Sequence, residues 1–263
     1  MQSEKNKILR IAQITDSHLF ADSSQKLNGL DTLNSLQQVM QAVLDSQPEL
    51  IIFSGDLVDR PEAAAYFAVK SVLDLSTVPV FCLPGNHDDP DLLKETLSSE
   101  KIHNDFSTLV NNWQLLFLNS YQPNTHAGKL GDNQLQMLDK HLRKHSEYSA
   151  LICLHHPPVP IHSSWMDAMG LEQSEELFAV VDRHPQVKAV IWGHIHQQFN
   201  QTRNGVKLLG TPSTCVQFMP GASQFCLDNK PPGYRWLELY ENGAITTEVI
   251  YLPDFDCPGN GLA

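Results

Sequence analysis

Five short groups of acidic, amide and imidazole side chains stand out in this 263-residue chain, and each follows directly after an apolar run. They are Asp16-Ser17-His18, Gly55-Asp56-Leu57-Val58-Asp59-Arg60, Gly85-Asn86-His87-Asp88, His155-His156-Pro157 and Gly193-His194-Ile195-His196. Neutral imidazole, carboxylate and amide oxygen suit Mn, Fe, Zn or Co, and the groups contain no thiolate for a softer metal. Two divalent cations about 3.5–4 Å apart can hold the attacking and leaving oxygens of a phosphoryl group. These residue types therefore indicate phosphoester chemistry at a pair of metal ions.

The elements that must position these groups begin with alternating strands and helices. We expect strands over residues 8–14, 50–53 and 78–83, and helices over residues 32–44 and 61–75. Pro61 would stand in the first turn of its helix, where proline is favoured. This rhythm predicts a mainly parallel sheet covered by helices. Ligands of such sheets gather outside the carboxyl ends of the strands, so the five groups are expected to meet at one sheet edge.

The later part of the chain is expected to add further strands. We expect strands over residues 106–110, 114–118, 150–154 and 187–192, and helices over residues 132–145 and 172–181. Short strands should follow over residues 197–203, 206–209, 234–240 and 245–251. Asn204-Gly205 and Asn242-Gly243 are sequence signals of hairpin turns, which favours antiparallel pairing and a second sheet in this half. No linker divides the chain, so we expect one domain over residues 1–252 and a tail over residues 253–263.

Composition limits the possible partners. The chain carries 18 basic and 30 acidic side chains, for a net charge of −12, so binding to nucleic acid or to an acidic membrane is not expected. A phosphate-containing substrate would need local positive charge, which metal ions can supply. No apolar stretch suits a signal peptide or a membrane span, which predicts a cytoplasmic location. Among five cysteines, Cys82 and Cys153 lie in apolar runs and should be buried.

In their order along the chain, the five groups resemble the calcineurin-like metallophosphoesterase superfamily. The resemblance extends through Gln13-Ile14-Thr15-Asp16, Thr211-Pro212-Ser213-Thr214-Cys215-Val216-Gln217-Phe218 and residues 233–249. These stretches are similar to the bacterial class III 3′,5′-cyclic AMP phosphodiesterases, over nearly the whole chain. The resemblance implies an α/β fold, a four-layer αββα sandwich of two mixed sheets flanked by helices.

The resemblance also implies two bound metal ions, divalent or trivalent, with Fe, Mn or Zn as the expected elements. One ion would be held by Asp16, His18, Asp56 and His196, and the other by Asp56, Asn86, His155 and His194. Asp56 would thus bridge the two ions. Family usage favours His155 over His156, whereas strand alternation says only that these two side chains point oppositely.

The implied reaction converts a cyclic nucleotide, 3′,5′-cyclic AMP, to 5′-AMP by attack of a metal-bridging hydroxide on phosphorus. Substrate contacts are expected from His18, Asp56, Asn86, His87 and His196. His87 would contact the phosphate and assist the leaving oxygen. Asp59 would orient His87, or else be a solvated carboxylate in a turn. Arg60 could reach the phosphate or could simply be solvated.

Several alternatives remain open at this stage. The metal centre would contact only the phosphate, so other cyclic nucleotides or glycerophosphodiesters are alternative substrates. Phosphoprotein phosphatase activity is a less favoured alternative. A non-catalytic scaffold with this fold is the rival from another class, but it would be expected to lack ligands that are present here. The apolar loop over residues 162–170 carries Trp165, which either stacks on a base or anchors the loop. The sequence does not indicate an oligomeric state.

Overall fold

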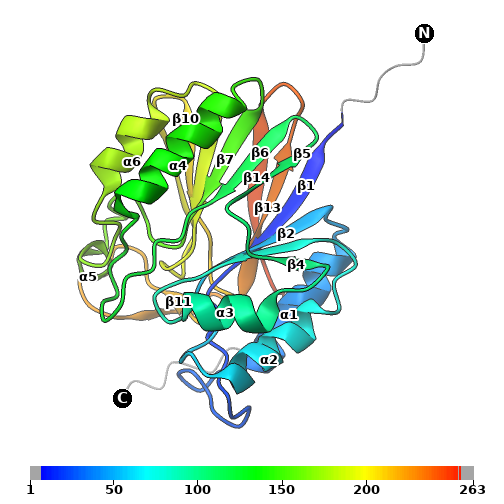
Figure 1. Cartoon of the computed structure of the whole chain (residues 1–263). Helices are drawn as coiled ribbons and strands as arrows, with labels where there is room; N and C mark the ends of the chain where they lie inside the picture. The colour runs from blue at the N-terminus through cyan, green and yellow to red at the C-terminus, as the bar shows by residue number, and fades with distance from the viewer. Residues whose placement is uncertain (1–6, 254, 256–263) are drawn as a thin grey trace.

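Three apolar clusters stacked on one another divide the molecule into four layers (Figure 1). The computed structural model describes residues 7–253 and residue 255. One cluster lies between the first sheet and helices α1 (Thr32–Asp45), α2 (Ala63–Leu73) and α3 (Pro90–Leu97). A second cluster fills the space between the two sheets. A third lies between the second sheet and helices α4 (Gly131–Lys144) and α6 (Ser174–Val181).

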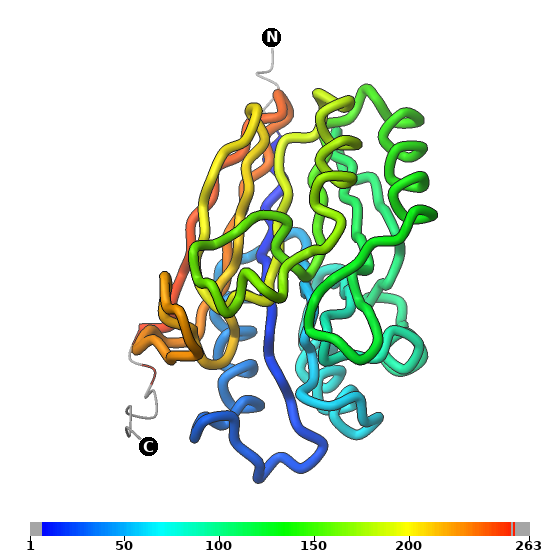
Figure 2. Tube along the Cα trace, turned by 90° about the vertical axis from the view of Figure 1, so that its left-hand side faces the viewer, coloured from blue at the N-terminus to red at the C-terminus, as the bar shows by residue number. Residues whose placement is uncertain are grey.

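The first sheet has the strand order β14-β13-β1-β2-β3-β4. Its parallel part consists of β1 (Leu9–Ile14), β2 (Leu50–Ser54), β3 (Val80–Leu83) and β4 (Ile102–His103). The antiparallel strands β13 (Gly233–Leu239) and β14 (Ile245–Tyr251) complete it beside β1, as the blue and orange-red segments of Figure 2 show. Both faces of the parallel strands are covered, which explains their continuous apolar sequences. On β1, Ile11 faces the other sheet and Ala12 faces the helices.

The second sheet has the strand order β5-β6-β7-β8-β10-β9. Its strands are β5 (Ser107–Val110), β6 (Trp113–Phe117), β7 (Ser149–Cys153), β8 (Val187–Trp192), β9 (Phe199–Arg203) and β10 (Val206–Gly210). The four inner strands are parallel, and the two edge strands are antiparallel to their neighbours. A separate two-stranded ribbon, β11 (Gln217–Phe218) and β12 (Leu227–Asp228), lies beyond β10 in sequence.

The predicted fold class is confirmed: two mixed sheets are flanked by helices in an α/β structure. The placement of the C-terminal strands was wrong, because β13 and β14 extend the first sheet, and the second sheet is built from residues 107–210. A hairpin signal such as Asn242-Gly243 fixes which strands pair, but it carries no information about where the hairpin docks.

Three helix predictions need correction. Helix α2 begins at Ala63, so Pro61 precedes the helix and does not stand in its first turn. Helix α3 was missed although its start has a clear signal, since the Asp89 side chain accepts hydrogen bonds from the backbone N–H groups of Asp91 and Leu92, with Pro90 in the first turn. The expected loop over residues 162–170 contains the single-turn helix α5 (Ser164–Asp167).

Other expectations concern burial and the end of the chain. Cys82 and Cys153 are buried, as predicted. Within the described residues, no helix is long and apolar enough to cross a membrane. The expected tail falls mostly on residues 254 and 256–263, which lie outside the described residues.

Candidate metal centre

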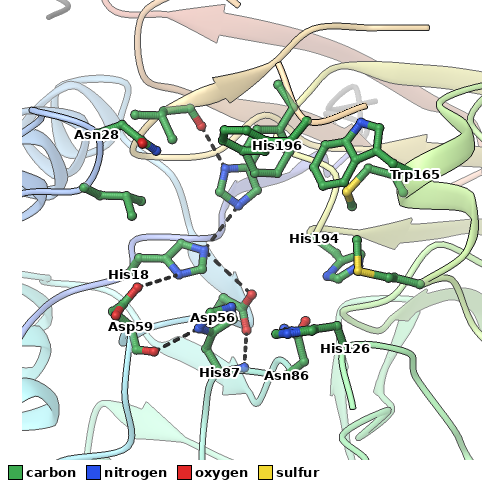
Figure 3. A pocket seen from close by; sticks show the side chains of 16 residues that line it. His18, Asn28, Asp56, Asp59, Asn86, His87, His126, Trp165, His194 and His196 are labelled. Carbon is green, nitrogen blue, oxygen red and sulfur yellow. Dashed lines mark hydrogen bonds and ion pairs between the residues drawn. The ribbon is translucent and has the colours of Figure 1, made fainter. Parts of the chain in front are cut away.

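The polar groups after five strands come together at one end of the two sheets. Asp16 and His18 follow β1, Asp56 follows β2, and Asn86 follows β3 of the first sheet. The second sheet contributes His155 after β7, and His194 and His196 after β8. A cavity of about 370 Å³ opens here, and seven predicted site residues line it (Figure 3). They are His18, Asp56, Asp59, Asn86, His87, His194 and His196. Asp16 and His155 are completely buried beside them.

The backbone at these strand ends is unusual. Five non-glycine residues of the cluster have positive φ angles between 44° and 66°. They are Asp16, His18, Asp56, His194 and His196. Each such left-handed residue costs about 1–3 kcal/mol, and such strain concentrates at functional sites. The first two loops also hold each other, since Asp16 N donates to Gly55 O at 3.0 Å and His18 N donates to Asp56 O at 3.1 Å.

Two glycines, Gly85 and Gly193, allow neighbouring side chains of the site to pack closely against the backbone. A Cβ atom at Gly85 would lie 2.2 Å from Asp56 Oδ1, and one at Gly193 would lie 2.0 Å from Thr15 Oγ1 and 2.8 Å from Asp16 Oδ2. Neither contact is possible for real atoms. The carboxylates can therefore occupy their positions only because these two neighbours have no side chain.

Hydrogen-bond acceptors converge around His155. Its Nδ1–H donates to the carbonyl of Ser54 at 2.8 Å, so Nε2 is the nitrogen that bears the lone pair once the imidazole is neutral, as it must be to bind a metal ion. That Nε2 lies 3.2 Å from Asp56 Oδ2 and 3.2 Å from Asn86 Oδ1. The Asn86 amide is held in this orientation by His126, whose Nδ1 lies 3.1 Å from Asn86 Nδ2. Acceptors that face one another without a donor are suited to a cation between them.

A second convergence lies around His196. Its Nδ1–H donates to the carbonyl of Val216 at 2.8 Å, which leaves Nε2 as an acceptor. This Nε2 lies 3.2 Å from His18 Nε2 and 3.4 Å from Asp16 Oδ1. His194 Nε2 is buried without any hydrogen-bond partner among the described residues. These acceptors, which face one another or lack a partner, fit a pair of metal ions. In groups such as Asp16-His18-His196 and Asp16-Asp56-His155, the potential ligand atoms lie within 4.8 Å of one another.

The charges of the cluster compete with the effect of burial. Burial disfavours an imidazolium at His155, but Asp56 and Asp16 overcome it and raise the pKa of His155 to about 9. Burial lowers the pKa of His18 to about 3 and also lowers the pKa of His194. Burial would raise the pKa of Asp56, yet His155 and His87 bring that pKa well below its usual value. Asp16 likewise overcomes burial at His196 and holds the pKa of His196 well above its usual value. In the metal-free protein, protons therefore gather on His155 and His196, where cations would otherwise be held.

His155 and His156 do not point to opposite sides. Strand β7 has already ended at Cys153, so the alternation of a strand no longer applies to these residues. Their ring centroids lie 4.9 Å apart, and both can join His194 in one ligand group. Only His155 also groups with Asp16 and Asp56. His156 Nδ1 instead lies 2.8 Å from Ser120 Oγ, and its Nε2 is buried without a partner.

His87 lines the cavity beside this cluster, and Asp59 contacts it in an unexpected way. His87 Nδ1–H donates to the backbone carbonyl of Asp59 at 2.8 Å, whereas we expected the carboxylate in this place. The Asp59 carboxylate lies 4.0 Å from His18 Nδ1, and burial raises its pKa. Arg60 Nε lies 3.9 Å from this carboxylate, and the Arg60 side chain is 80% exposed. The exposure of Arg60 matches the alternative in which this side chain is solvated and does not reach the phosphate.

Several cavity residues were not found from the sequence. His126 and Asn28 line the cavity, but neither follows an apolar run, and the pair Asn28-Gly29 indicates only a turn. Asp88 lies behind it, where its carboxylate accepts hydrogen bonds from Gly85 N, Leu57 N and the Tyr66 hydroxyl. Asp88 had a sequence signal, since it stands in the group after β3. Its role is to join the loops on either side of Asp56.

A calcineurin-like phosphoesterase family model matches residues 9–198. The chain therefore belongs to the calcineurin-like phosphoesterase family. Within it, the chain is 40% identical over 249 residues to the 3′,5′-cyclic adenosine monophosphate phosphodiesterase CpdA of Escherichia coli, covering 94% of this chain and 90% of that protein. It is 39% identical to a 3′,5′-cyclic-nucleotide phosphodiesterase of Nostoc sp., with 93% of each chain covered. It is 36% identical to the CpdA of Pseudomonas aeruginosa, covering 95% of this chain and 94% of the relative.

Solved structures agree on the fold. A dimetal phosphatase from Danio rerio superposes with a TM-score of 0.63 at 15% identity, covering 92% of this chain and 98% of that one. A purple acid phosphatase from yellow lupin gives a TM-score of 0.61 at 12% identity, covering 98% and 58%. These similarities concern the arrangement of the two sheets and their helices.

Proposed function

We propose that this chain hydrolyses 3′,5′-cyclic AMP to 5′-AMP at a dinuclear metal site. The observation that carries the proposal is the set of converging acceptor atoms in a chain that is 36–40% identical to cyclic AMP phosphodiesterases over more than nine-tenths of its length. Such acceptors bind cations, and cations suit the transfer of a phosphoryl group. The net charge of −12 adds to the argument, because a phosphate anion would otherwise be repelled.

We assign two metal ions to the cluster. Asp16, His18, Asp56 and His196 would hold one ion, and Asp56, Asn86, His155 and His194 would hold the other, with Asp56 common to both. The ligand group Asp16-His18-His196 supports the first set, and the second is supported by His155 Nε2, which lies 3.2 Å from Asp56 Oδ2 and 3.2 Å from Asn86 Oδ1. Oxygen and imidazole donors without thiolate suit Fe, Mn or Zn. When bound, the two ions would activate water and balance negative charge on the phosphoryl oxygens.

The protein's own groups would orient the reactants. Hydrolysis to 5′-AMP forms a bond between a water oxygen and phosphorus and breaks the bond from phosphorus to O3′, which must receive a proton. His87 is placed for this transfer, because it lines the cavity and its Nδ1–H is committed to the Asp59 carbonyl. Its Nε2 therefore carries the exchangeable proton, and the imidazolium form would donate that proton to O3′. His126 lies beside the Asn86 amide nitrogen, so the Asn86 oxygen would be left to face the second ion.

A substrate panel on the purified, manganese-loaded protein tests the proposal. We expect cyclic AMP to be converted to 5′-AMP, with slower turnover of 2′,3′-cyclic nucleotides and glycerophosphodiesters. Identification of the product distinguishes 5′-AMP from 3′-AMP and so reports which P–O bond breaks. Turnover of glycerophosphodiesters without any turnover of cyclic AMP would overturn the substrate assignment. No turnover of any phosphodiester by a metal-loaded, folded protein would favour the non-catalytic scaffold.

A further inference from the structure

The cavity has a polar end and an apolar end. The polar end is the candidate metal centre, while Trp165, Phe218 and Phe225 line the opposite end together with Met166, Met169 and Val216. The two ends are continuous, because the Phe218 ring stacks on His196 with centroids 4.1 Å apart and planes 9° apart. A group bound at the metal centre is therefore within reach of the aromatic side chains.

The three aromatic rings form one cluster. Trp165 meets Phe218 edge to face at 5.1 Å and Phe225 at 5.6 Å, and Phe218 lies 5.4 Å from Phe225. They come from two segments, helix α5 and the ribbon region that contains β11 and β12. Phe225 is 55% exposed although it is large and apolar. An exposed aromatic face beside a catalytic cavity is typical of ligand binding.

One amide stands at the apolar end. Asn28 and Gly29 occupy the centre of a tight turn, with φ angles of 48° and 84°, closed by two hydrogen bonds between Leu27 and Leu30. Asn-Gly suits such a turn by itself, so the turn explains the residue type. It does not explain the position, because the Asn28 side chain lines the cavity and makes no hydrogen bond within the described part of the chain. Figure 3 shows this amide across the cavity from Asn86 and His126.

We propose that this apolar end binds the purine base of the nucleotide, with Phe218, Phe225 and Trp165 contacting its ring and Asn28 its polar edge. The inference rests on the proposed function and names the part of the substrate that gives it specificity. Aromatic rings stack on any base, whereas an amide presents a donor and an acceptor, which match the exocyclic amine and the adjacent ring nitrogen of adenine. A cavity of about 370 Å³ lies within the range of small-ligand sites.

The test compares ligands with and without a base. In wild type, 5′-AMP should compete with substrate at least about tenfold better than ribose 5-phosphate, since base stacking contributes about 1–3 kcal/mol. Phe225→Ala should raise KM for cyclic AMP about 5- to 100-fold and reduce the preference for 5′-AMP over ribose 5-phosphate by a similar factor. The exposed position of Phe225 means that this variant should fold normally. The kcat/KM ratio of cyclic AMP to glycerophosphoethanolamine should fall in parallel.

Asn28→Gly removes the amide without straining the turn, because glycine tolerates positive φ. We expect KM for cyclic AMP to rise about 3- to 10-fold, as for one lost hydrogen-bonding group. Asn204→Gly is the matched control: Asn204-Gly205 forms a similar turn, with φ angles of 51° and 83°, at the β9–β10 hairpin and away from the cavity. This control should leave KM unchanged.

The outcomes separate the two proposals. If wild type does not hydrolyse cyclic AMP, the proposed function fails, whereas the ligand competition still reports on the base. If wild type hydrolyses cyclic AMP but Phe225→Ala and Asn28→Gly leave the ligand preference and the substrate ratio unchanged, the base is bound elsewhere and this inference is wrong. Equal losses for cyclic AMP and glycerophosphoethanolamine would likewise contradict it.

Discussion

Adding a single methyl group at Gly85 should disable the metal centre. In Gly85→Ala the new Cβ would lie 2.2 Å from Asp56 Oδ1 and 2.4 Å from Asp56 N, so the Asp56 carboxylate has to move by about 1 Å to restore ordinary contact distances. That oxygen accepts a hydrogen bond from His87 N at 2.8 Å, and the movement would break it. Asp56 is also the residue assigned to both metal ions, so the displacement reaches the centre of the site.

The magnitude follows from two terms. Overpacking costs about 1–3 kcal/mol. A hydrogen bond to a carboxylate contributes about 1.5–3 kcal/mol, of which part is regained if water reaches the displaced group. We therefore expect a loss of about 2–4 kcal/mol in the free energy of unfolding, which lowers Tm by about 4–16 °C for a chain of this size. Displacing a catalytic group by about 1 Å should lower kcat/KM for cyclic AMP about 100-fold.

Thermal unfolding, metal content and cyclic AMP turnover should be measured together. Gly205→Ala is the control, because its Cβ would meet nothing within 4 Å while its φ of +83° still imposes backbone strain. This control should lose about 1–2 kcal/mol of stability, with full metal content and activity. The reasoning is refuted if folded Gly85→Ala binds two metal ions and turns over cyclic AMP within twofold of wild type.

Three further predictions concern the same centre. Asp56→Ala should lose metal and activity together, and normal turnover with full metal content, measured by elemental analysis, would rule out its bridging role. His87→Ala should keep its metal ions, because the hydrogen bond to Asp56 comes from the His87 backbone N–H and the side chain is assigned to neither ion, but it should lose about 10²–10⁴ in kcat. The His87 ring also lies in a possible ligand group with His18 and Asp56, so loss of metal would instead make His87 a ligand. Metal affinity should rise with pH up to about 9, by at most about tenfold per pH unit for each proton displaced, because the pKa of His155 is raised to about 9 and its protonated form cannot bind a cation. Chelator competition between pH 6 and 9 measures this slope, and an affinity independent of pH would show that His155 is already neutral in the metal-free protein.

The sequence predicted the meeting of the site residues for a physical reason. Parallel strands end at one edge of a sheet, so the order of apolar runs and polar groups was enough to predict that residues as distant in sequence as Asp16 and His196 lie close together. The pattern of buried strands and amphipathic helices likewise indicated the layers. Both features depend on local periodicity and on strand direction, which a sequence displays.

Other features depend on which atom of a residue is used, or on contacts between distant segments. The sequence placed Asp59 beside His87, but it could not distinguish the backbone carbonyl of Asp59 from its carboxylate. Asn28 suits a turn wherever that turn lies, and only the folded chain brings it to the cavity. The hairpin of β13 and β14 was recognised, yet its docking beside β1 depends on the exposed edge of β1.

The pairing of β1 with β13 has a consequence for biosynthesis. All seven assigned ligands have been synthesised once residue 196 is added, but the strand that leads to Asp16 still lacks one neighbour. In the register, Leu9 lies opposite Leu239 and Gln13 lies opposite Arg235, more than 220 residues later. A chain stopped soon after residue 198 would carry every ligand on an open-edged sheet that is prone to pair with other chains. Nascent chains should therefore acquire a stable metal centre only as translation finishes, and late nonsense mutations should produce aggregated, metal-poor fragments.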